Sequence, residues 1–228
     1  MFPRGCVHCG GAVEKTGYRF LCAECASVLQ FSRPPVCRTC GYPFFGIIAA
    51  PKSCPHCAEL EPLFEEGRTL FLAKGPGRAL LHELKYNAGF HVLHDLSRML
   101  AGAPRFTGFL GNAVLVPVPL HPAKERERGY NQSHLIARTL AEAAEGCRVR
   151  ALLQRVRPTQ SQTRLDRSAR LRNVKNAFAL KPRALVIPGR LHILVDDVFT
   201  TGATLNACAE TLRDAGIGPV RVVTVGHG

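Results

Sequence analysis

The fold is decided by residues 191–205, whose sequence is Leu-His-Ile-Leu-Val-Asp-Asp-Val-Phe-Thr-Thr-Gly-Ala-Thr-Leu. An apolar run typical of a buried strand ends in two adjacent carboxylates, Asp196 and Asp197, and a turn rich in threonine and glycine follows. Such a turn offers backbone N–H groups, hydroxyls and a helix N-terminus to a phosphate group. Carboxylates just before the turn can accept hydrogen bonds from sugar hydroxyls. The stretch therefore predicts a site for a phosphorylated ribose.

Two other interpretations of this stretch are less favoured. A P-loop is excluded because no Gly-Lys-Ser/Thr tripeptide follows the turn. An ordinary helix start needs only one capping residue and an unremarkable turn. Here the strand is followed by several polar or small residues in one register, namely Asp196, Asp197, Thr200, Thr201, Gly202 and Thr204. The larger set favours a ligand site.

The chain around this stretch alternates between strand-like and helix-like segments. Strands are predicted at 69–73, 113–118, 148–153, 177–180, 191–195 and 220–225. Helices are predicted at 78–87, 91–100, 135–144 and 203–215. This order predicts an α/β fold with a parallel sheet and ligands at the carboxyl ends of its strands. We assign this domain to residues 67–228, with a linker over 61–66 and a smaller module over residues 1–60.

Cysteines dominate the N-terminal module. Eight of the ten form four CxxC pairs: Cys6 and Cys9, Cys22 and Cys25, Cys37 and Cys40, and Cys54 and Cys57. Each pair supplies half of a tetrahedral zinc site, so four pairs predict two structural Zn²⁺ ions. Sequential pairing is the most economical arrangement, and a cross-braced arrangement (first pair with third, second with fourth) remains open. His8 and His56 lie inside CxxC pairs, where we expect solvent-facing side chains rather than ligands, and Cys147 and Cys208 are expected in the core.

Composition limits the class of protein. Hydrophobic residues make up 46% of the 228 residues, which excludes wholesale disorder. No run approaches the ~20 apolar residues of a membrane span, and the N-terminus has no apolar core of a secretory signal. We therefore expect a cytoplasmic protein without membrane insertion, in which cysteines bind metal rather than form disulfides.

Residues 196–204 resemble the signature with which type I phosphoribosyltransferases bind 5-phosphoribosyl 1-pyrophosphate (PRPP). The resemblance implies that Asp196 and Asp197 hold the 2- and 3-hydroxyls of the ribose. It also implies a 5-phosphate site made of Thr200, Thr201, Gly202, Ala203 and Thr204, with Mg²⁺ bridging the ribose hydroxyls and the pyrophosphate. Such chemistry needs little from the protein beyond positioning and charge stabilisation, so no catalytic base is assigned.

Two further segments narrow the resemblance. The position of a pyrophosphate loop is taken by Val118, Pro119 and Leu120, followed by Arg126 and Arg128. A polar, basic stretch after residue 157 matches the mobile hood of these enzymes and contains Thr159, Gln162, Arg164, Arg167 and Arg170. Together with the CxxC pairs, these segments resemble the ComF family of competence proteins, in which a double zinc ribbon precedes a phosphoribosyltransferase domain. The resemblance implies a role in natural transformation, with incoming single-stranded DNA and other competence proteins as partners.

Charge gives a separate indication of the partner. The formal net charge is +13, and residues 121–190 carry sixteen Lys and Arg against five Asp and Glu. This excess suggests a large anionic partner such as single-stranded DNA, although a basic solvated surface is the alternative. Aromatic residues for base stacking are sparse in this segment, with Tyr130 and Phe178 the candidates. We therefore expect binding through the phosphate backbone, with little sequence preference.

Two rival functions remain at this stage. One is an active phosphoribosyltransferase that joins ribose 5-phosphate to a base in nucleotide salvage, and no base pocket is recognisable in the sequence. The other is a non-catalytic PRPP sensor that uses its zinc ribbons as a docking surface. Pyrophosphate release with a panel of bases would identify the first. Loss of a partner, with PRPP binding retained, after deletion of the ribbons would identify the second.

Overall fold

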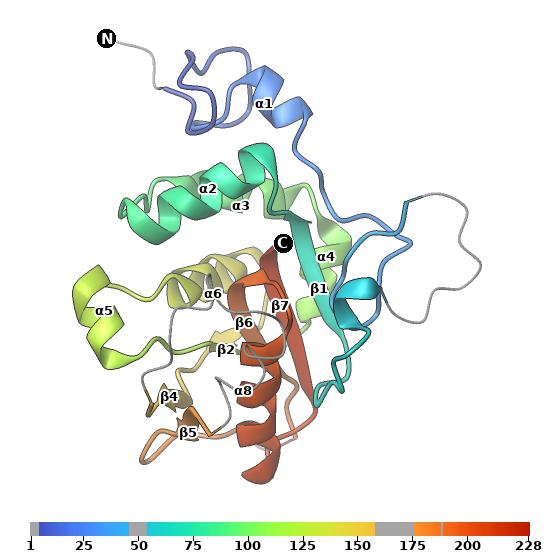
Figure 1. Cartoon of the computed structure of the whole chain (residues 1–228), viewed down its shortest axis with the longest axis vertical. Coiled ribbons are helices and arrows are strands. Elements are labelled where there is room, and N and C mark those ends of the chain that lie inside the picture. The colour runs from blue at the N-terminus through green and yellow to red at the C-terminus, as the bar shows by residue number, and fades with distance from the viewer. Residues whose placement is uncertain (1–4, 46–53, 158–175, 188) are drawn as a thin grey trace.

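The computed structural model describes residues 5–45, 54–157, 176–187 and 189–228 (Figure 1). Its centre is a five-stranded sheet in the order β1-β7-β6-β2-β3. These strands are β1 (Gly67–Leu72), β7 (Val220–His227), β6 (His192–Phe199), β2 (Val114–Pro117) and β3 (Arg148–Val149). Every neighbouring pair is parallel, so the carboxyl ends of the strands lie at one edge. The predicted α/β fold with a parallel sheet is confirmed.

Helices cover both faces of the sheet (Figure 1). They are α1 (Ala23–Ser27), α2 (Gly75–Tyr86), α3 (Val92–Ala101), α4 (Pro104–Leu110), α5 (Pro122–Arg128), α6 (Gln132–Ala143) and α8 (Ala203–Asp214), with a 3₁₀ turn η1 (Pro55–Cys57). Successive strand residues face opposite sides, as β geometry requires. Leu115 and Ile193 join the core that contains α2, α3 and α6, whereas Val116 and Leu194 join the core on the side of α8.

The two cysteine clusters join different cores. Buried cysteines of the first cluster belong to the core beside α3, and those of the second belong to the core beside α8. The carboxylate of Asp95, buried on α3, accepts hydrogen bonds from the N–H groups of Arg19 and Phe20 at 2.7 and 2.9 Å. The N–H of Gly67 donates to Arg38 O at 2.9 Å. Both halves of the N-terminal segment therefore form hydrogen bonds with the domain that follows the predicted linker.

The structure differs from the predicted elements in the strand predicted at 148–153 and in several short helices. The single strand predicted at 148–153 is two short strands, because the chain leaves β2 after Val149 and turns at Arg150, whose carbonyl accepts from Leu152 N–H. The second piece, β4 (Leu153–Arg155), pairs antiparallel with β5 (Phe178–Leu180) in a separate sheet. Helices α1, α4 and α5 and the 3₁₀ turn η1 were not predicted.

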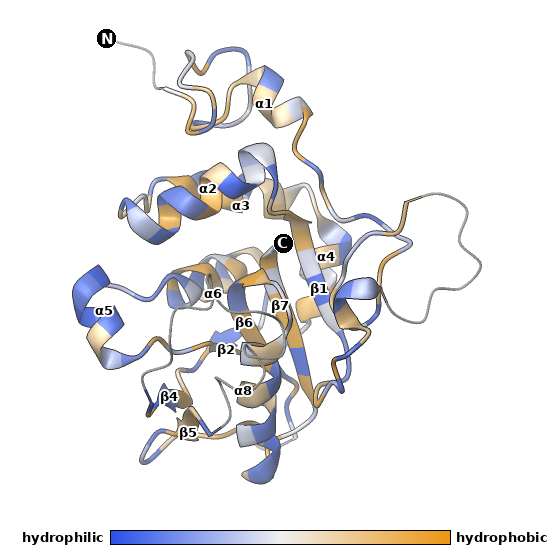
Figure 2. Cartoon of the chain, viewed as in Figure 1, coloured by the Kyte–Doolittle hydropathy of each residue, from blue (hydrophilic) through white to orange (hydrophobic). Residues whose placement is uncertain are grey.

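The distribution of hydropathy follows the arrangement of the sheet and the helices that cover it. Apolar colour is visible along β1 and β7 in Figure 2, whereas α5 is largely hydrophilic and has no buried residue. Across the part of the chain that the structure describes, no helix combines the length and the apolar character needed to cross a bilayer.

Candidate phosphate site and metal centres

The two predicted ribose ligands lie at the carboxyl edge of the sheet, near the end of β6. This strand continues past Val195 to Phe199, so Asp196 and Asp197 are strand residues with side chains on alternate faces. Asp196 Oδ1 accepts a hydrogen bond from Ser133 Oγ at 2.8 Å. Asp197 Oδ2 lies 2.7 Å from Lys85 Nζ. The acids thus take their partners from two helices, α6 and α2.

Ser133 and Lys85 both influence the protonation of Asp196. Burial, together with the neighbouring Asp197, raises the pKa of Asp196 to about 7, although the Ser133 hydrogen bond and Lys85 oppose the rise. Burial alone would lower the pKa of Lys85, but the adjacent Asp197 outweighs it and raises that pKa above its ordinary value. A carboxyl group that titrates near neutrality at a strand end is typical of a functional site.

The turn after β6 contains the residues predicted to hold a phosphate, and it leads directly into α8. Gly202 is the N-cap of α8 with φ of +75°, a conformation that favours glycine. Thr201 Oγ1 accepts a hydrogen bond from Ala203 N–H at 3.4 Å, and both residues are buried. Thr200 is exposed and Thr204 is half-buried. The five residues predicted to hold a phosphate therefore surround the N-terminus of a twelve-residue helix.

The predicted pyrophosphate loop is divided between two elements. Val118, Pro119 and Leu120 form an irregular segment directly after β2, whereas Arg126 and Arg128 lie on α5. Arg126 is exposed, and Arg128 Nη1 donates to Gln132 Oε1. The predicted hood residues Thr159, Gln162, Arg164, Arg167 and Arg170 lie outside the described residues.

The eight paired cysteines form two clusters in sequential order. Cys6, Cys9, Cys22 and Cys25 make the first, and Cys37, Cys40, Cys54 and Cys57 make the second. The sulfur atoms of each cluster lie within 4.8 Å of one another, with Cys9 and Cys22 at 3.7 Å and Cys40 and Cys54 at 3.4 Å. Tetrahedral zinc with Zn–S bonds of ~2.3 Å needs sulfur separations of ~3.8 Å. Both donor sets fit structural zinc, and the cross-braced arrangement is excluded.

Comparison with known proteins gives a consistent picture. Residues 1–58 match the double zinc ribbon domain family. The chain is 30% identical to Competence protein F of Haemophilus influenzae over 95% of this chain and 94% of the relative. It belongs to the ComF family of competence proteins. It is also 32% identical to the DNA utilization protein YhgH of Salmonella typhimurium (89% of this chain, 88% of the relative) and 25% identical to Competence protein ComFC of Bacillus subtilis (86% and 79%).

Histidines lie beside both sulfur clusters of this ComF protein. His8 is exposed, as expected, and its Nδ1 lies 3.3 Å from Cys25 Sγ. His56 is half-buried, and its ring packs against Tyr42 and His227 at centroid distances of 4.6 and 4.8 Å, so the expected solvent-facing orientation was wrong. His227 Nε2 lies 3.2 Å from Cys40 Sγ. Hydrogen bonding to metal-bound sulfur is the usual role of such neighbours.

Three polar residues of the ComF strand-end site were not predicted. Lys85 and Ser133 contact the two aspartates. Asn131 Nδ2 donates a hydrogen bond to Val118 O at 3.0 Å, and Asn131 Oδ1 caps α6. Lys85 follows the buried Leu81 by four residues, so a lysine on the apolar face of a helix was the available signal. Nothing in the local sequence distinguishes Ser133 or Asn131 from ordinary helix-start residues.

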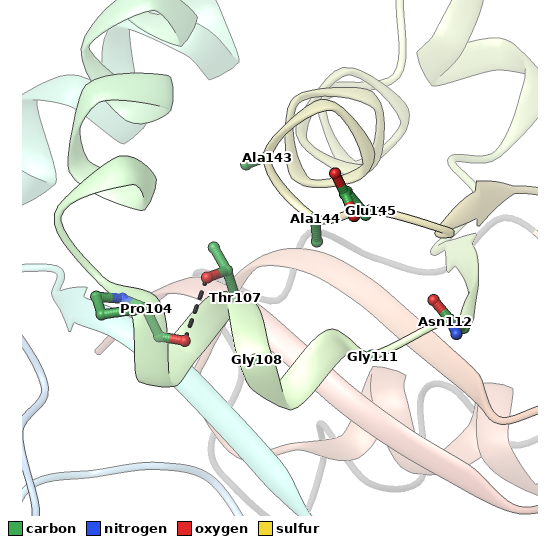
Figure 3. A pocket seen from close by; sticks show the side chains of 8 residues that line it. All are labelled: Pro104, Thr107, Gly108, Gly111, Asn112, Ala143, Ala144 and Glu145. Atoms are coloured by element: carbon green, nitrogen blue, oxygen red, sulfur yellow. Dashed lines mark hydrogen bonds between the residues drawn. The ribbon is translucent and has the colours of Figure 1, made fainter.

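A shallow hollow lies at the other end of the sheet, where the strands begin (Figure 3). Its lining comes from α4 and from the end of α6, and includes Thr107, Asn112 and Glu145. Thr107 Oγ1 donates to Pro104 O within its own helix. None of the predicted site residues lines this hollow, so it does not coincide with the predicted ribose-phosphate site.

Proposed function

We propose that the chain binds PRPP with Mg²⁺ at the carboxyl edge of its sheet and handles incoming single-stranded DNA in the cytoplasm during natural transformation. The observation that carries the proposal is the placement of Asp196 and Asp197 near the end of β6, shortly before the glycine-capped N-terminus of α8. One end of that arrangement accepts hydrogen bonds and the other donates them, which matches a ribose diol and a phosphate.

Each residue has a proposed role in binding. The carboxylates of Asp196 and Asp197 accept hydrogen bonds from the ribose hydroxyls, and the N–H groups of residues 200–204 donate to the 5-phosphate. Lys85, whose Nζ already neutralises Asp197, supplies a cation beside the ribose. A bound Mg²⁺ would lie beside Asp196 and Asp197 and would offset the negative charge of the pyrophosphate. Val118, Pro119 and Leu120 lie at the neighbouring strand end, where the pyrophosphate would extend.

The DNA-handling part of the proposal has two supports. Relatives carry the names Competence protein F and DNA utilization protein. The structure also assembles an exposed aromatic and basic surface from distant segments. Residues Tyr86 and Phe90 are 59% and 47% exposed, and the Arg128 guanidinium carbon lies 5.5 Å from the centroid of the Tyr86 ring. Phe90 packs edge-on against Tyr130 at 4.7 Å. Rings with an adjacent arginine suit the stacking of single-stranded bases.

Replacing both acids tests the PRPP proposal. The variant Asp196→Asn, Asp197→Asn should lose the rise in melting temperature that PRPP and Mg²⁺ give the wild type, because the diol loses its charged acceptors. The unliganded variant should keep the wild-type fold by circular dichroism, since both side chains lie at a strand end. An unchanged ligand-induced shift would show that these residues do not bind PRPP. Pyrophosphate release with a panel of nucleobases then separates binding from turnover in salvage.

A further inference from the structure

The turn between β6 and α8 rests on the segment that follows the second cysteine cluster. Leu60 comes three residues after Cys57, and its N–H donates to Cys57 O at 3.1 Å. A Cβ placed on Gly202 would lie 2.7 Å from Leu60 Cδ2. Leu60 therefore packs directly against the glycine of the phosphate turn, leaving no room for a side chain there.

Asn206 fixes the same segment from the other side. Its Oδ1 accepts a hydrogen bond from Leu63 N–H at 2.7 Å, and its Nδ2 donates to Glu61 O at 3.1 Å. Asn206 lies on α8 one turn after Gly202, whose carbonyl accepts from Asn206 N–H. The Asn206 side chain thus joins the start of α8 to two backbone groups that lie shortly after Cys57.

A second route runs through β7. His227 Nε2 lies 3.2 Å from Cys40 Sγ, and the His227 ring stacks on Phe199 with centroids 5.2 Å apart and planes at 21°. Phe199 Cζ lies 2.7 Å from the Cβ position of Gly202. Two independent sets of contacts, from Cys57 and from Cys40, therefore end at the same glycine.

We infer that the metal of the second cysteine cluster and PRPP bind cooperatively; the inference rests on the proposed PRPP site. Structural zinc fixes CxxC segments that are otherwise unconstrained, so its loss frees Leu60 and the backbone groups that hold Asn206. Phosphate binding must then order the turn itself, and that ordering weakens the observed affinity. The buried cysteines of the first cluster belong to the core beside α3 rather than the core beside α8, so its metal should be uncoupled.

Thermodynamic reciprocity supplies the test: if zinc tightens PRPP binding, PRPP must tighten zinc binding by the same factor. The zinc affinity of each cluster is measured by equilibrium competition with a chelator of known affinity, at constant Mg²⁺, with and without saturating PRPP. We expect PRPP to lower the zinc dissociation constant of the second cluster by about tenfold and to leave that of the first cluster unchanged. In Cys9→Ser, which disrupts only the first cluster, the remaining zinc should be the one that responds.

A substitution that contacts neither zinc nor PRPP tests whether the contacts through Asn206 carry the coupling. Asn206→Ala removes the two hydrogen bonds to residues 61 and 63 without altering a sulfur or the turn, so the PRPP effect on zinc affinity should fall severalfold. Glu210→Ala, at an exposed position one turn further along α8, should keep the full effect. If calorimetry shows no PRPP binding by the wild type, the proposed function fails. If PRPP binds and neither zinc affinity changes, only the coupling is overturned.

Discussion

Single residues decide how the molecule responds to pH, and His192 is the clearest case. It is 1% exposed at the start of β6, and neither ring nitrogen has a hydrogen-bond partner in the part of the chain that the structure describes. Burial lowers its pKa below the ordinary value. The unfolded chain therefore binds a proton there more readily than the folded chain, so this residue contributes to the loss of stability as pH falls below about 6.5.

Replacing His192 should remove its contribution to the loss of stability at low pH. The free energy of unfolding of His192→Leu should exceed the wild-type value, by about 1–2 kcal/mol at pH 8 because two unpaired nitrogens are removed. The difference should grow by up to about 1.4 kcal/mol for each pH unit below 6.5. Urea unfolding at several pH values measures it. A difference that is constant with pH would show that His192 is not held neutral.

Asp196 sets a second pH dependence, in binding rather than stability. With a pKa of about 7, its carboxyl is partly protonated at neutrality, and only the carboxylate accepts freely from a diol. The affinity for PRPP should therefore rise between about pH 6 and pH 8. The ligand's own phosphates titrate in this range, so Ser133→Ala is the informative control. Losing the Ser133 hydrogen bond should move the midpoint measured by calorimetry to higher pH, whereas a midpoint set by the ligand would stay in place.

At the scale of elements, the aromatic and basic surface proposed for DNA is formed by α2, α5 and the segment that follows each of them. Tyr86→Ala and Phe90→Ala should each weaken binding of a single-stranded oligonucleotide by about 5- to 100-fold, since base stacking contributes ~1–3 kcal/mol per base. Fluorescence anisotropy at several salt concentrations should show an unchanged salt slope for both. Arg128→Ala should instead reduce the slope of log affinity against log salt by about 0.7, because one phosphate contact is lost. Equal loss of slope in all three variants would contradict a stacking role for the rings.

The same scale shows how far the sequence predicts this structure. The long strands and helices followed from their apolar periodicity, and the phosphate turn followed because strand, acids, turn and helix are contiguous. Helices α1, α4 and α5 were missed because they are short. Helices α4 and α5 each begin with proline and are followed by a glycine with positive φ, Gly111 at +51° and Gly129 at +80°, and these caps were the unused signal. Lys85 and Ser133 could not be placed beside the aspartates, since only the chain topology brings α2 and α6 to the end of β6.

For the molecule as a whole, the two cysteine clusters predict both metal content and stability. Purified protein should contain two zinc ions per chain by atomic absorption. A chelator should unfold more than the N-terminal segment, because all four cysteines of the second cluster are buried in the core beside α8. Loss of near-ultraviolet circular dichroism and of PRPP binding, together with zinc release, would report this. One zinc ion per chain, or none, would contradict the assignment of two sites.

The contact between His227 and Cys40 has a consequence for the order of synthesis. The two residues are 187 positions apart, so at ~5–20 residues per second the ribosome makes one on the order of ten to forty seconds after the other. β7 also pairs with both β1 and β6, so the sheet is divided until that strand has emerged. The second ribbon is thus among the first segments made and among the last to reach its final surroundings. Throughout that interval its four thiolates depend on metal capture, rather than on the rest of the fold, for protection from oxidation.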